Sequence, residues 1–222
     1  MKIGEYNAIK AKAQFIGADY SEFDILDGGH CLMIKQGDEL LVIIDEFAES
    51  LDYVNNWPIF LYTAEKFRFS KIVKLVGGEN LKRLNLAFNS LRANTIDISG
   101  VSCKNLEDVS QMFSYTVAKN IIFGNFDTSR VSNFSKMFDQ ANIENIDLST
   151  LDIRSGKDFS GMFRCTECKN LKISCFDGYA GFLNKRKINC NNMFDLCKID
   201  KVETTSLYIM QKYKSECRRR KQ

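Results

Sequence analysis

A two-residue phrase that returns at a fixed interval constrains the fold of this chain more than any other feature. Met-Phe occurs at positions 112–113, 137–138 and 162–163, which lie 25 residues apart. The same interval leads back to Ala87-Phe88, and a further copy, Met193-Phe194, follows a longer insertion. A constant period of about 20 to 50 residues is typical of stacked repeats, in which neighbouring copies bury one continuous core.

Apolar residues recur at fixed offsets from the repeated Phe. The pair separated by four residues fits one face of a helix, and the positions eight and ten after the Phe fit alternate residues of a strand. Each copy is therefore predicted to form a short helical turn, a loop and a short strand. The recurring residues are, four before the Phe, Leu84, Val109, Phe134, Phe159 and Cys190; eight after it, Ile96, Ile121, Ile146, Leu171 and Val202; ten after it, Ile98, Phe123, Leu148 and Ile173; thirteen after it, Val101, Phe126, Leu151 and Phe176.

Residues 125–138 read NFDTSRVSNFSKMF and resemble the repeat of the BspA-type bacterial surface proteins, a leucine-rich-like family. The family pattern is close to N-F-D-T-S-x-V-x-x-M-x-x-M-F, with Phe134 standing at the place of its first Met. The resemblance extends over roughly residues 80–205. It implies a right-handed solenoid with a parallel sheet along one side, and it implies adhesion or protein binding at a cell surface. No catalytic residue comes with the motif.

The predicted fold class is thus α/β: a leucine-rich-repeat-like solenoid with short parallel strands, preceded by a small β-rich N-terminal cap or domain. We expect the cap in 1–78, about five repeats in 79–205, and a capping helix with a basic tail in 206–222, because terminal units of stacked repeats shield the last copy. In the cap, alternation predicts a strand at 9–15 and a hairpin within 31–44. Helical spacing predicts a helix that starts at Asp45 and ends at Trp57-Pro58, and another strand is expected to lead to Gly77-Gly78.

The C-terminal segment combines a predicted helix with most of the positive charge. Thr205 or Ser206 can cap a helix that carries Leu207, Met210 and Tyr213. Residues 1–75 hold 8 basic and 12 acidic side chains, whereas residues 201–222 hold 7 basic and 2 acidic ones. Such a tail can bind nucleic acid or acidic proteins, or it can be an ordinary solvated end. The tail residues are Arg218, Arg219, Arg220 and Lys221.

Cysteine and aspartate provide the candidate metal ligands. Cys165 and Cys168 have the spacing of half a zinc site, with Cys190 and Cys197 as possible partners. We interpret the eight cysteines mainly as small buried hydrophobes, with zinc binding and disulfide formation as alternatives. Carboxylates at 127, 152 and 177 could hold calcium, or each could cap its own turn. We therefore predict no metal site and no cofactor.

The functional prediction is a non-enzymatic scaffold that binds a protein partner through its strand face. The only His, His30, is directly followed by Cys31, and adjacent strand residues point to opposite faces, so no catalytic pair is expected. Outward strand positions are expected to line the recognition surface, with ordinary solvated strand as the alternative. The candidate partner-binding residues are Asp97, Ile122, Asp147, Lys172 and Glu203.

The sequence is compatible with more than one location and function. The first residues lack the basic segment and apolar core of a secretory signal, which predicts a cytoplasmic protein, or a cell-surface one if a signal has been removed. No apolar run is long enough to cross a membrane. The alternatives are a cell-surface adhesion protein, an inhibitor of a host nuclease or ribonucleoprotein from a phage or mobile element, and a protein that binds nucleic acid through residues 212–221.

Overall fold

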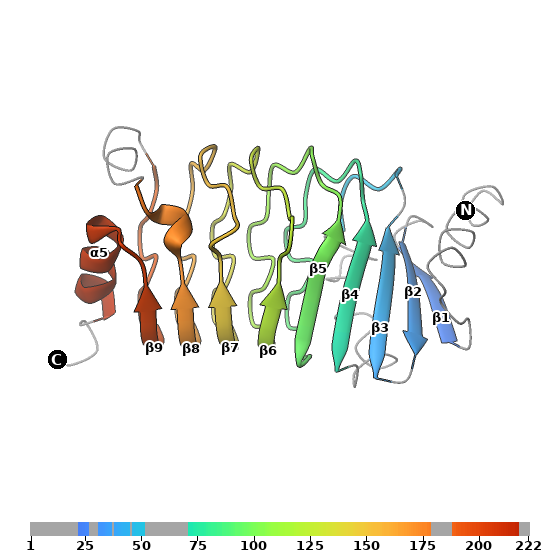
Figure 1. Cartoon of the computed structure of the whole chain (residues 1–222), viewed down its shortest axis with the longest axis horizontal. Helices are drawn as coiled ribbons and strands as arrows, with labels where there is room; N and C mark the ends of the chain where they lie inside the picture. Colours follow the sequence, from blue (N-terminus) through green and yellow to red (C-terminus); the bar gives the residue numbers. More distant parts are fainter. Residues whose placement is uncertain are drawn as a thin grey trace.

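The computed structural model describes residues 22–26, 31–36, 38–44, 46–51, 71–178 and 188–217. These residues form one nine-stranded sheet, in which the strands lie side by side in the order of the chain (Figure 1). One 3-10 turn, η2 (Ser174–Phe176), and one helix, α5 (Leu207–Cys217), complete the described elements. The strands are β1 (Glu22–Leu26), β2 (Cys31–Gln36), β3 (Glu39–Ile44), β4 (Ile72–Gly77), β5 (Thr95–Val101), β6 (Val117–Ile122), β7 (Asn142–Asp147), β8 (Glu167–Lys172) and β9 (Lys198–Glu203).

Strand direction divides the sheet into a short antiparallel part and a long parallel part. β1 pairs antiparallel with β2, and β2 with β3, which confirms the predicted hairpin within 31–44. From β3 to β9 every neighbouring pair is parallel. β4 ends at Gly77 and pairs with both β3 and β5, so the sheet continues without a break across the predicted boundary between residues 78 and 79. The architecture is therefore an α/β-like open sheet with seven parallel strands and few helices.

The strand and the helix predicted for the N-terminal part have different outcomes. The strand expected at 9–15 lies outside the described residues. The helix expected from Asp45 is wrong over 46–51, where the chain forms a turn and then a parallel bridge between Ser50 and Arg83. This bridge is the first of a series that joins equivalent residues of successive windings, because the chain here already follows the path of the later repeats. The series continues through Arg83, Asp108, Asn133, Asp158 and Asn189.

Consecutive β-turns, not a helical turn, carry the repeated Phe, so that prediction is wrong. In the central copy the N–H of Met137 donates to the carbonyl of Phe134, and that of Ala141 to Phe138, which are three-residue and not four-residue steps. The N–H of Phe138 instead donates to Met162 of the next winding, at 2.9 Å. Lys136 has a positive φ of 55°, which a helix excludes. A four-residue spacing therefore fits this succession of turns as well as a helix.

The predicted core positions are buried except for Val202, which is only partly buried, and the strands use these positions differently. In β7 the buried side chains are Ile143 and Ile146, five and eight residues after the Phe, and Leu148 is buried just beyond the strand. Between the two buried residues, Glu144 and Asn145 both lie toward the outside. In β6 the N–H groups of Lys119 and Asn120 share one carbonyl, that of Asn94, at 2.9 and 3.1 Å. Two consecutive donors on one acceptor are typical of a β-bulge, which interrupts strict alternation.

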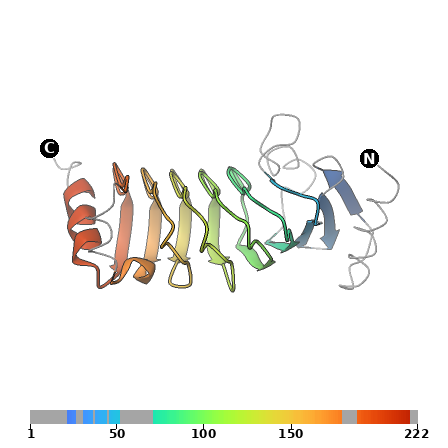
Figure 2. The same cartoon turned by 90° about the horizontal axis from the view of Figure 1, so that it is seen from above.

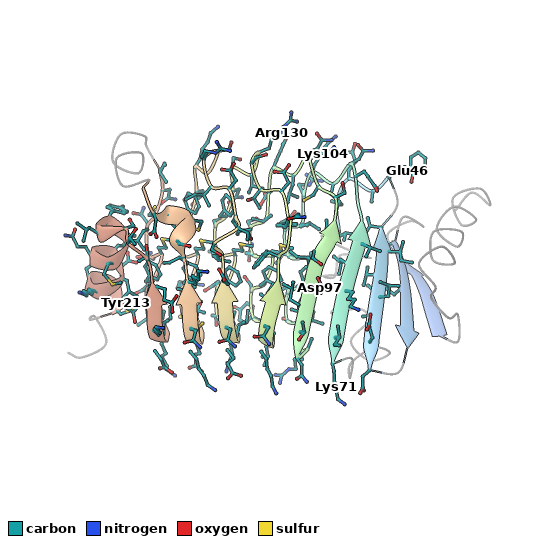
Figure 3. All side chains as sticks on the ribbon, in the orientation of Figure 1. Glu46, Lys71, Asp97, Lys104, Arg130 and Tyr213 are labelled. Carbon is teal, nitrogen blue, oxygen red and sulfur yellow. The ribbon has the colours of Figure 1, made fainter. Side chains whose placement is uncertain are left out.

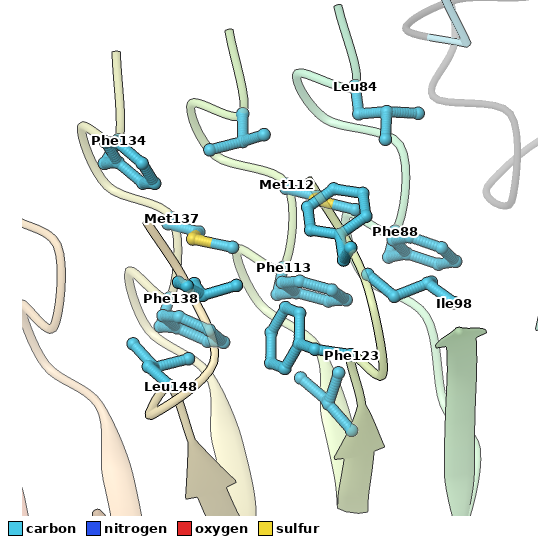
Figure 4. Close-up of a cluster of buried hydrophobic side chains, with 14 of the residues drawn as sticks. Leu84, Phe88, Ile98, Met112, Phe113, Phe123, Phe134, Met137, Phe138 and Leu148 are labelled. Atoms are coloured by element: carbon cyan, nitrogen blue, oxygen red, sulfur yellow. The ribbon is translucent and has the colours of Figure 1, made fainter. Parts of the chain in front are cut away.

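A stack of buried Phe rings runs through the core behind the sheet (Figure 4). The rings of Phe88, Phe113, Phe138, Phe163 and Phe194 follow one another at centroid distances of 5.0, 5.4, 5.5 and 5.3 Å, with interplanar angles below 10°. A second pair, Phe134 and Phe159, stacks at 5.0 Å. Equivalent residues of parallel windings lie one strand spacing apart, so identical rings adopt the same orientation and stack with favourable geometry. The successive windings thus insert their rings into one shared interior, as the 25-residue period predicts.

Helix α5 covers the end of this stack (Figure 2). Its start is as predicted, since the N–H of Ile209 donates to the hydroxyl of Ser206 at 3.4 Å. The ring of Tyr213 packs edge-on against Phe194 at 5.5 Å, and its hydroxyl donates to the carbonyl of Ile199 at 2.9 Å. Ile209 enters the core, whereas Leu207 is 76% exposed. The predicted helix after Ser206 thus forms and covers the last winding.

Candidate protein-binding surface

The outward face of the parallel strands presents polar side chains in rows that cross β6–β9. Four positions of each strand take part, at four, six, seven and nine residues after the repeated Phe. The β-bulge described above is the reason that both the sixth and the seventh position lie outside. In chain order the rows are Val117, Asn142, Glu167 and Lys198; Lys119, Glu144, Lys169 and Asp200; Asn120, Asn145, Asn170 and Lys201; and Ile122, Asp147, Lys172 and Glu203.

The first two rows line an open groove of about 500 Å³, together with Ala93 and Asn94. Positive and negative side chains alternate along it. Lys169 pairs with Glu144 at 2.6 Å, and Lys198 pairs with Glu167. The hydrogen bond from Lys169 lowers the pKa of the Glu144 carboxyl below its ordinary value. Exposed ion pairs of this kind contribute little to folding stability, so a partner can replace them at small cost.

An asparagine ladder separates the groove from the last row. The side-chain amide of Asn145 donates to Asn120 at 3.0 Å, and that of Asn170 donates to Asn145 at 2.8 Å. The ladder arises because in-register parallel strands place identical side chains side by side. It holds three neighbouring strands in a fixed relation on the exposed face.

The fourth row contains the sequence-predicted residues, and we call it the Asp97 row because Asp97 of β5 extends it. Strand register pairs Asp97 with Ile122, and it pairs Lys172 with both Asp147 and Glu203. Ile122 is 45% exposed, an unusual place for a large apolar side chain. The structure therefore brings all five predicted residues into one row on one face, which begins at Asp97 of β5 (labelled in Figure 3).

The Asp97 and Asp147 carboxylates of this row are held in place by nearby serines and, for Asp147, by Lys172 of the next strand. The backbone N–H and the hydroxyl of Ser99 donate to Asp97 at 2.9 and 2.6 Å. Asp147 accepts from the N–H of Ser149 at 2.9 Å and from Lys172 at 3.2 Å. Partial burial opposes ionisation of Asp147, but the hydrogen bonds from Ser149 and Lys172 outweigh it, and its pKa lies below the ordinary value. The row is thus a fixed pattern of charge around one apolar side chain.

Strict strand alternation does not predict the groove, because it turns the seventh and ninth residues after the Phe outward and omits the fourth and sixth. The alternation of Lys119, Glu144, Lys169 and Asp200, each six residues after the repeated Phe, was nevertheless visible in the sequence. A polar residue in two consecutive positions of every copy is the signal that indicates a bulge.

The zinc interpretation finds no support in the arrangement of the cysteines. The Cys168 thiol lies 3.1 Å from the carbonyl of Asn170, and Cys190 is buried beneath α5 beside Tyr208. Cys197 lies against Cys217, which was not among the predicted ligands, and Cys165 is half-buried. Within the described ranges, no three His, Cys, Asp or Glu side chains gather closely enough to hold a metal ion. Most of the thiols are buried, as the hydrophobe interpretation predicts.

The 25-residue series of aspartates caps turns. Asp127 accepts the N–H of Ser129 at 2.9 Å, and Asp152 accepts that of Arg154 at 3.0 Å. Asp177 departs from the pattern, because it accepts the N–H groups of Thr205 and Ser206 ahead of α5, at 2.7 and 3.1 Å.

The predicted basic tail, 218–221, lies outside the described residues. In the described part of the chain, no helix has the length and apolar character needed to cross a membrane.

These features define a repeat protein whose windings each add one strand to a mainly parallel sheet. The chain belongs to the family described as Mycoplasma protein of unknown function, DUF285, whose model matches residues 82–206. The matched segment begins just before the first stacked Phe and ends at the start of α5. Comparisons with curated proteins and with solved structures gave no match.

Proposed function

We propose that this chain is a non-enzymatic protein-binding scaffold, a leucine-rich-like solenoid of the BspA type that holds a protein partner on the outward face of β5–β9. The observation that carries the proposal is the continuity of this face. Five neighbouring strands present the groove, the asparagine ladder and the Asp97 row side by side, with no described segment crossing between them (Figure 1).

Rigidity supports a role in recognition. The backbone of each winding is tied to the next by strand pairing and by the hydrogen bonds of the Phe turns, so the exposed side chains start from fixed positions. A surface that is already ordered loses less conformational entropy when it binds. Alternating charges favour a partner with the complementary pattern and disfavour others, while Ile122 and Val117 provide apolar contact.

Affinity purification followed by mass spectrometry tests the proposal. The bait would be the full chain, in its natural form and as an Asp97→Ala/Ile122→Ala/Asp147→Ala/Lys172→Ala variant. A matched control would carry Lys104→Ala and Arg130→Ala, which lie on the loops away from the strand face (Figure 3). We expect the control to capture the same proteins as the natural chain and the Asp97-row variant to lose them by tenfold or more.

A second variant covers the groove. Lys119→Ala/Glu144→Ala/Lys169→Ala removes its alternating charges without touching the core, since all three side chains lie outward. If both sheet-face variants, shown to be folded by circular dichroism, capture the same partners as the natural chain, the strand face is not the interface and the proposal is wrong.

Adhesion at a cell surface is the second candidate, and the BspA-type resemblance of residues 125–138 is what favours it. It uses the same strand face but a different location and partner. Limited proteolysis of intact cells distinguishes the two: a surface adhesin is digested, whereas a scaffold inside the cell is protected until the cells are lysed.

A further inference from the structure

The C-terminal end of α5 replaces a missing winding at the edge of the repeat. In four successive windings the N–H of the stacked Phe donates to the Met carbonyl of the next winding, at 2.8 to 2.9 Å. Phe194 belongs to the last winding, and no further winding follows it among the described residues. Its N–H donates instead to the Glu216 carboxylate of α5, at 2.7 Å. A side-chain oxygen thus stands where the pattern requires a backbone oxygen.

A second contact of the same kind involves Cys217. In two windings a Thr hydroxyl donates to the carbonyl of the stacked Phe in the preceding winding, Thr116 to Phe88 at 2.7 Å and Thr166 to Phe138 at 2.6 Å. At the end of the repeat, the Cys217 thiol lies 3.5 Å from the carbonyl of Phe194, in the corresponding place.

Cys197 holds the equivalent position within the last winding, three residues after its Phe. Cys197 and Cys217 therefore occupy consecutive places in one ladder of side chains. Their sulfur atoms lie 2.6 Å apart, closer than any other pair of thiols that the described residues show. The contact is set by the packing of α5 and not by nearness in sequence, because 20 residues separate the two cysteines.

We propose that Cys197 and Cys217 are a modification site, at which thiol–disulfide exchange with a small-molecule disulfide closes an intrachain disulfide that fastens α5 to the last winding. The reaction requires the two groups to meet without movement of the backbone, and the packing of α5 already provides this. The thiols are present as such in the structure, so the proposed bond is the oxidised form of the pair.

Exposure and ionisation assign different roles to the two thiols. Cys217 is half-buried, whereas Cys197 is buried. The hydrogen bond from Cys197 lowers the pKa of the Cys217 thiol, although burial opposes this. The same contact, together with burial, raises the pKa of Cys197 above its ordinary value. Cys217 is therefore the thiol that ionises first and that an external disulfide can reach.

The reaction proceeds in two exchanges. The Cys217 thiolate attacks one sulfur of the small-molecule disulfide, the S–S bond of that molecule breaks, and one small thiol leaves with the proton lost by Cys217. The Cys197 sulfur then attacks Sγ of Cys217 in the mixed disulfide and displaces the second small thiol, which takes the proton of Cys197. The two protein thiols are oxidised to one disulfide, and one small disulfide is reduced to two thiols.

The bond would hold the cap in place. Glu216 and Tyr213 contact the last winding only while α5 is docked, and the Tyr213 hydroxyl donates to the carbonyl of Ile199 in β9, the last strand of the sheet. An uncovered strand edge can pair with another chain, so the disulfide protects the repeat from lengthening by association.

Mass spectrometry of the full chain after incubation with oxidised glutathione tests the proposal. We expect a product 2 Da lighter than the reduced chain, with the peptides of Cys197 and Cys217 joined, and we expect a thermal midpoint higher by roughly 5–10 °C because a loop of about 20 residues is closed. Dithiothreitol should reverse both changes. Cys165→Ser, which alters a half-buried thiol without a sulfur neighbour in the described part of the chain, should behave as the natural chain.

Cys197→Ser and Cys217→Ser should each abolish the 2 Da loss, and circular dichroism would show whether they remain folded. A second measurement on the natural chain does not depend on these variants. If both cysteines of the glutathione-treated chain still react with N-ethylmaleimide after unfolding, or if the product stops at the mixed disulfide on Cys217, the proposal is wrong.

Discussion

Replacement of Phe138 by Ala should cost more stability than any exposed substitution, because this ring lies in the middle of the stack. Phe138 is fully buried, with Phe113 at 5.4 Å on one side and Phe163 at 5.5 Å on the other. Removal of a buried Phe side chain costs about 3–5 kcal/mol. Two stacked neighbours, each contributing about 0.5–1.5 kcal/mol beyond burial, place the expected loss at the upper end, about 4–5 kcal/mol.

Urea unfolding followed by circular dichroism and by tyrosine fluorescence measures this loss. For a chain of this size about 1 kcal/mol corresponds to roughly 2–4 °C, so the thermal midpoint should fall by about 10–15 °C. Two probes are needed because repeat proteins can unfold in parts, and only coincident transitions give one free energy. Leu207→Ala is the matched control, since Leu207 is 76% exposed and its loss should change stability by less than about 0.5 kcal/mol. If Phe138→Ala and Leu207→Ala lower the thermal midpoint equally, the stacked rings do not form one shared core.

Two further predictions concern the end of the repeat and acid stability. Glu216→Ala leaves the N–H of Phe194 without its acceptor and should lower the free energy of unfolding by about 1–3 kcal/mol. Glu216→Gln keeps an acceptor and should recover most of that free energy. Equal losses for the two variants in urea unfolding would contradict the role of this hydrogen bond. Hydrogen bonds from Ser129 lower the pKa of Asp127 in the folded state. Such a carboxyl stabilises the folded chain when the pH is above its unfolded-state pKa, and this stabilisation is lost as the pH falls through its folded-state pKa. The urea midpoint should therefore decline between about pH 5 and pH 2, less steeply in Asp127→Asn than in the natural chain, and parallel declines would show that this carboxyl does not contribute.

The periodic core could be predicted from the sequence because it depends only on interval and residue type. When copies of constant length lie in register, equivalent positions superimpose, and Phe at the same position of every copy must form a stack. The stacking of Phe113, Phe138 and Phe163 could therefore be predicted from their positions in the sequence. The five residues of the Asp97 row each lie nine residues after a repeated Phe, which is why the structure brings them together.

The local conformation around the repeated Phe could not be predicted in this way. A separation of four between Phe134 and Phe138 is compatible with a helix, and only hydrogen bonds to the next winding select consecutive turns. The same holds for the N-terminal segment 46–51, where pairing of Ser50 with Arg83 overrides the helical spacing. Local propensity is a weak prior, and contacts with residues far away in the chain decide the outcome.

The repeat, its length and the apolar side chains that fill it could be read from the sequence, since these follow from spacing. Three further features depend on contacts between distant residues, which bring together side chains from different windings and from α5. These are the bulge that turns Lys119 and its equivalents outward to form the groove, the replacement of a backbone acceptor by Glu216, and the meeting of Cys197 with Cys217. A period specifies which residues are equivalent, but it carries no information on how the last copy ends, because that end has no next copy to repeat.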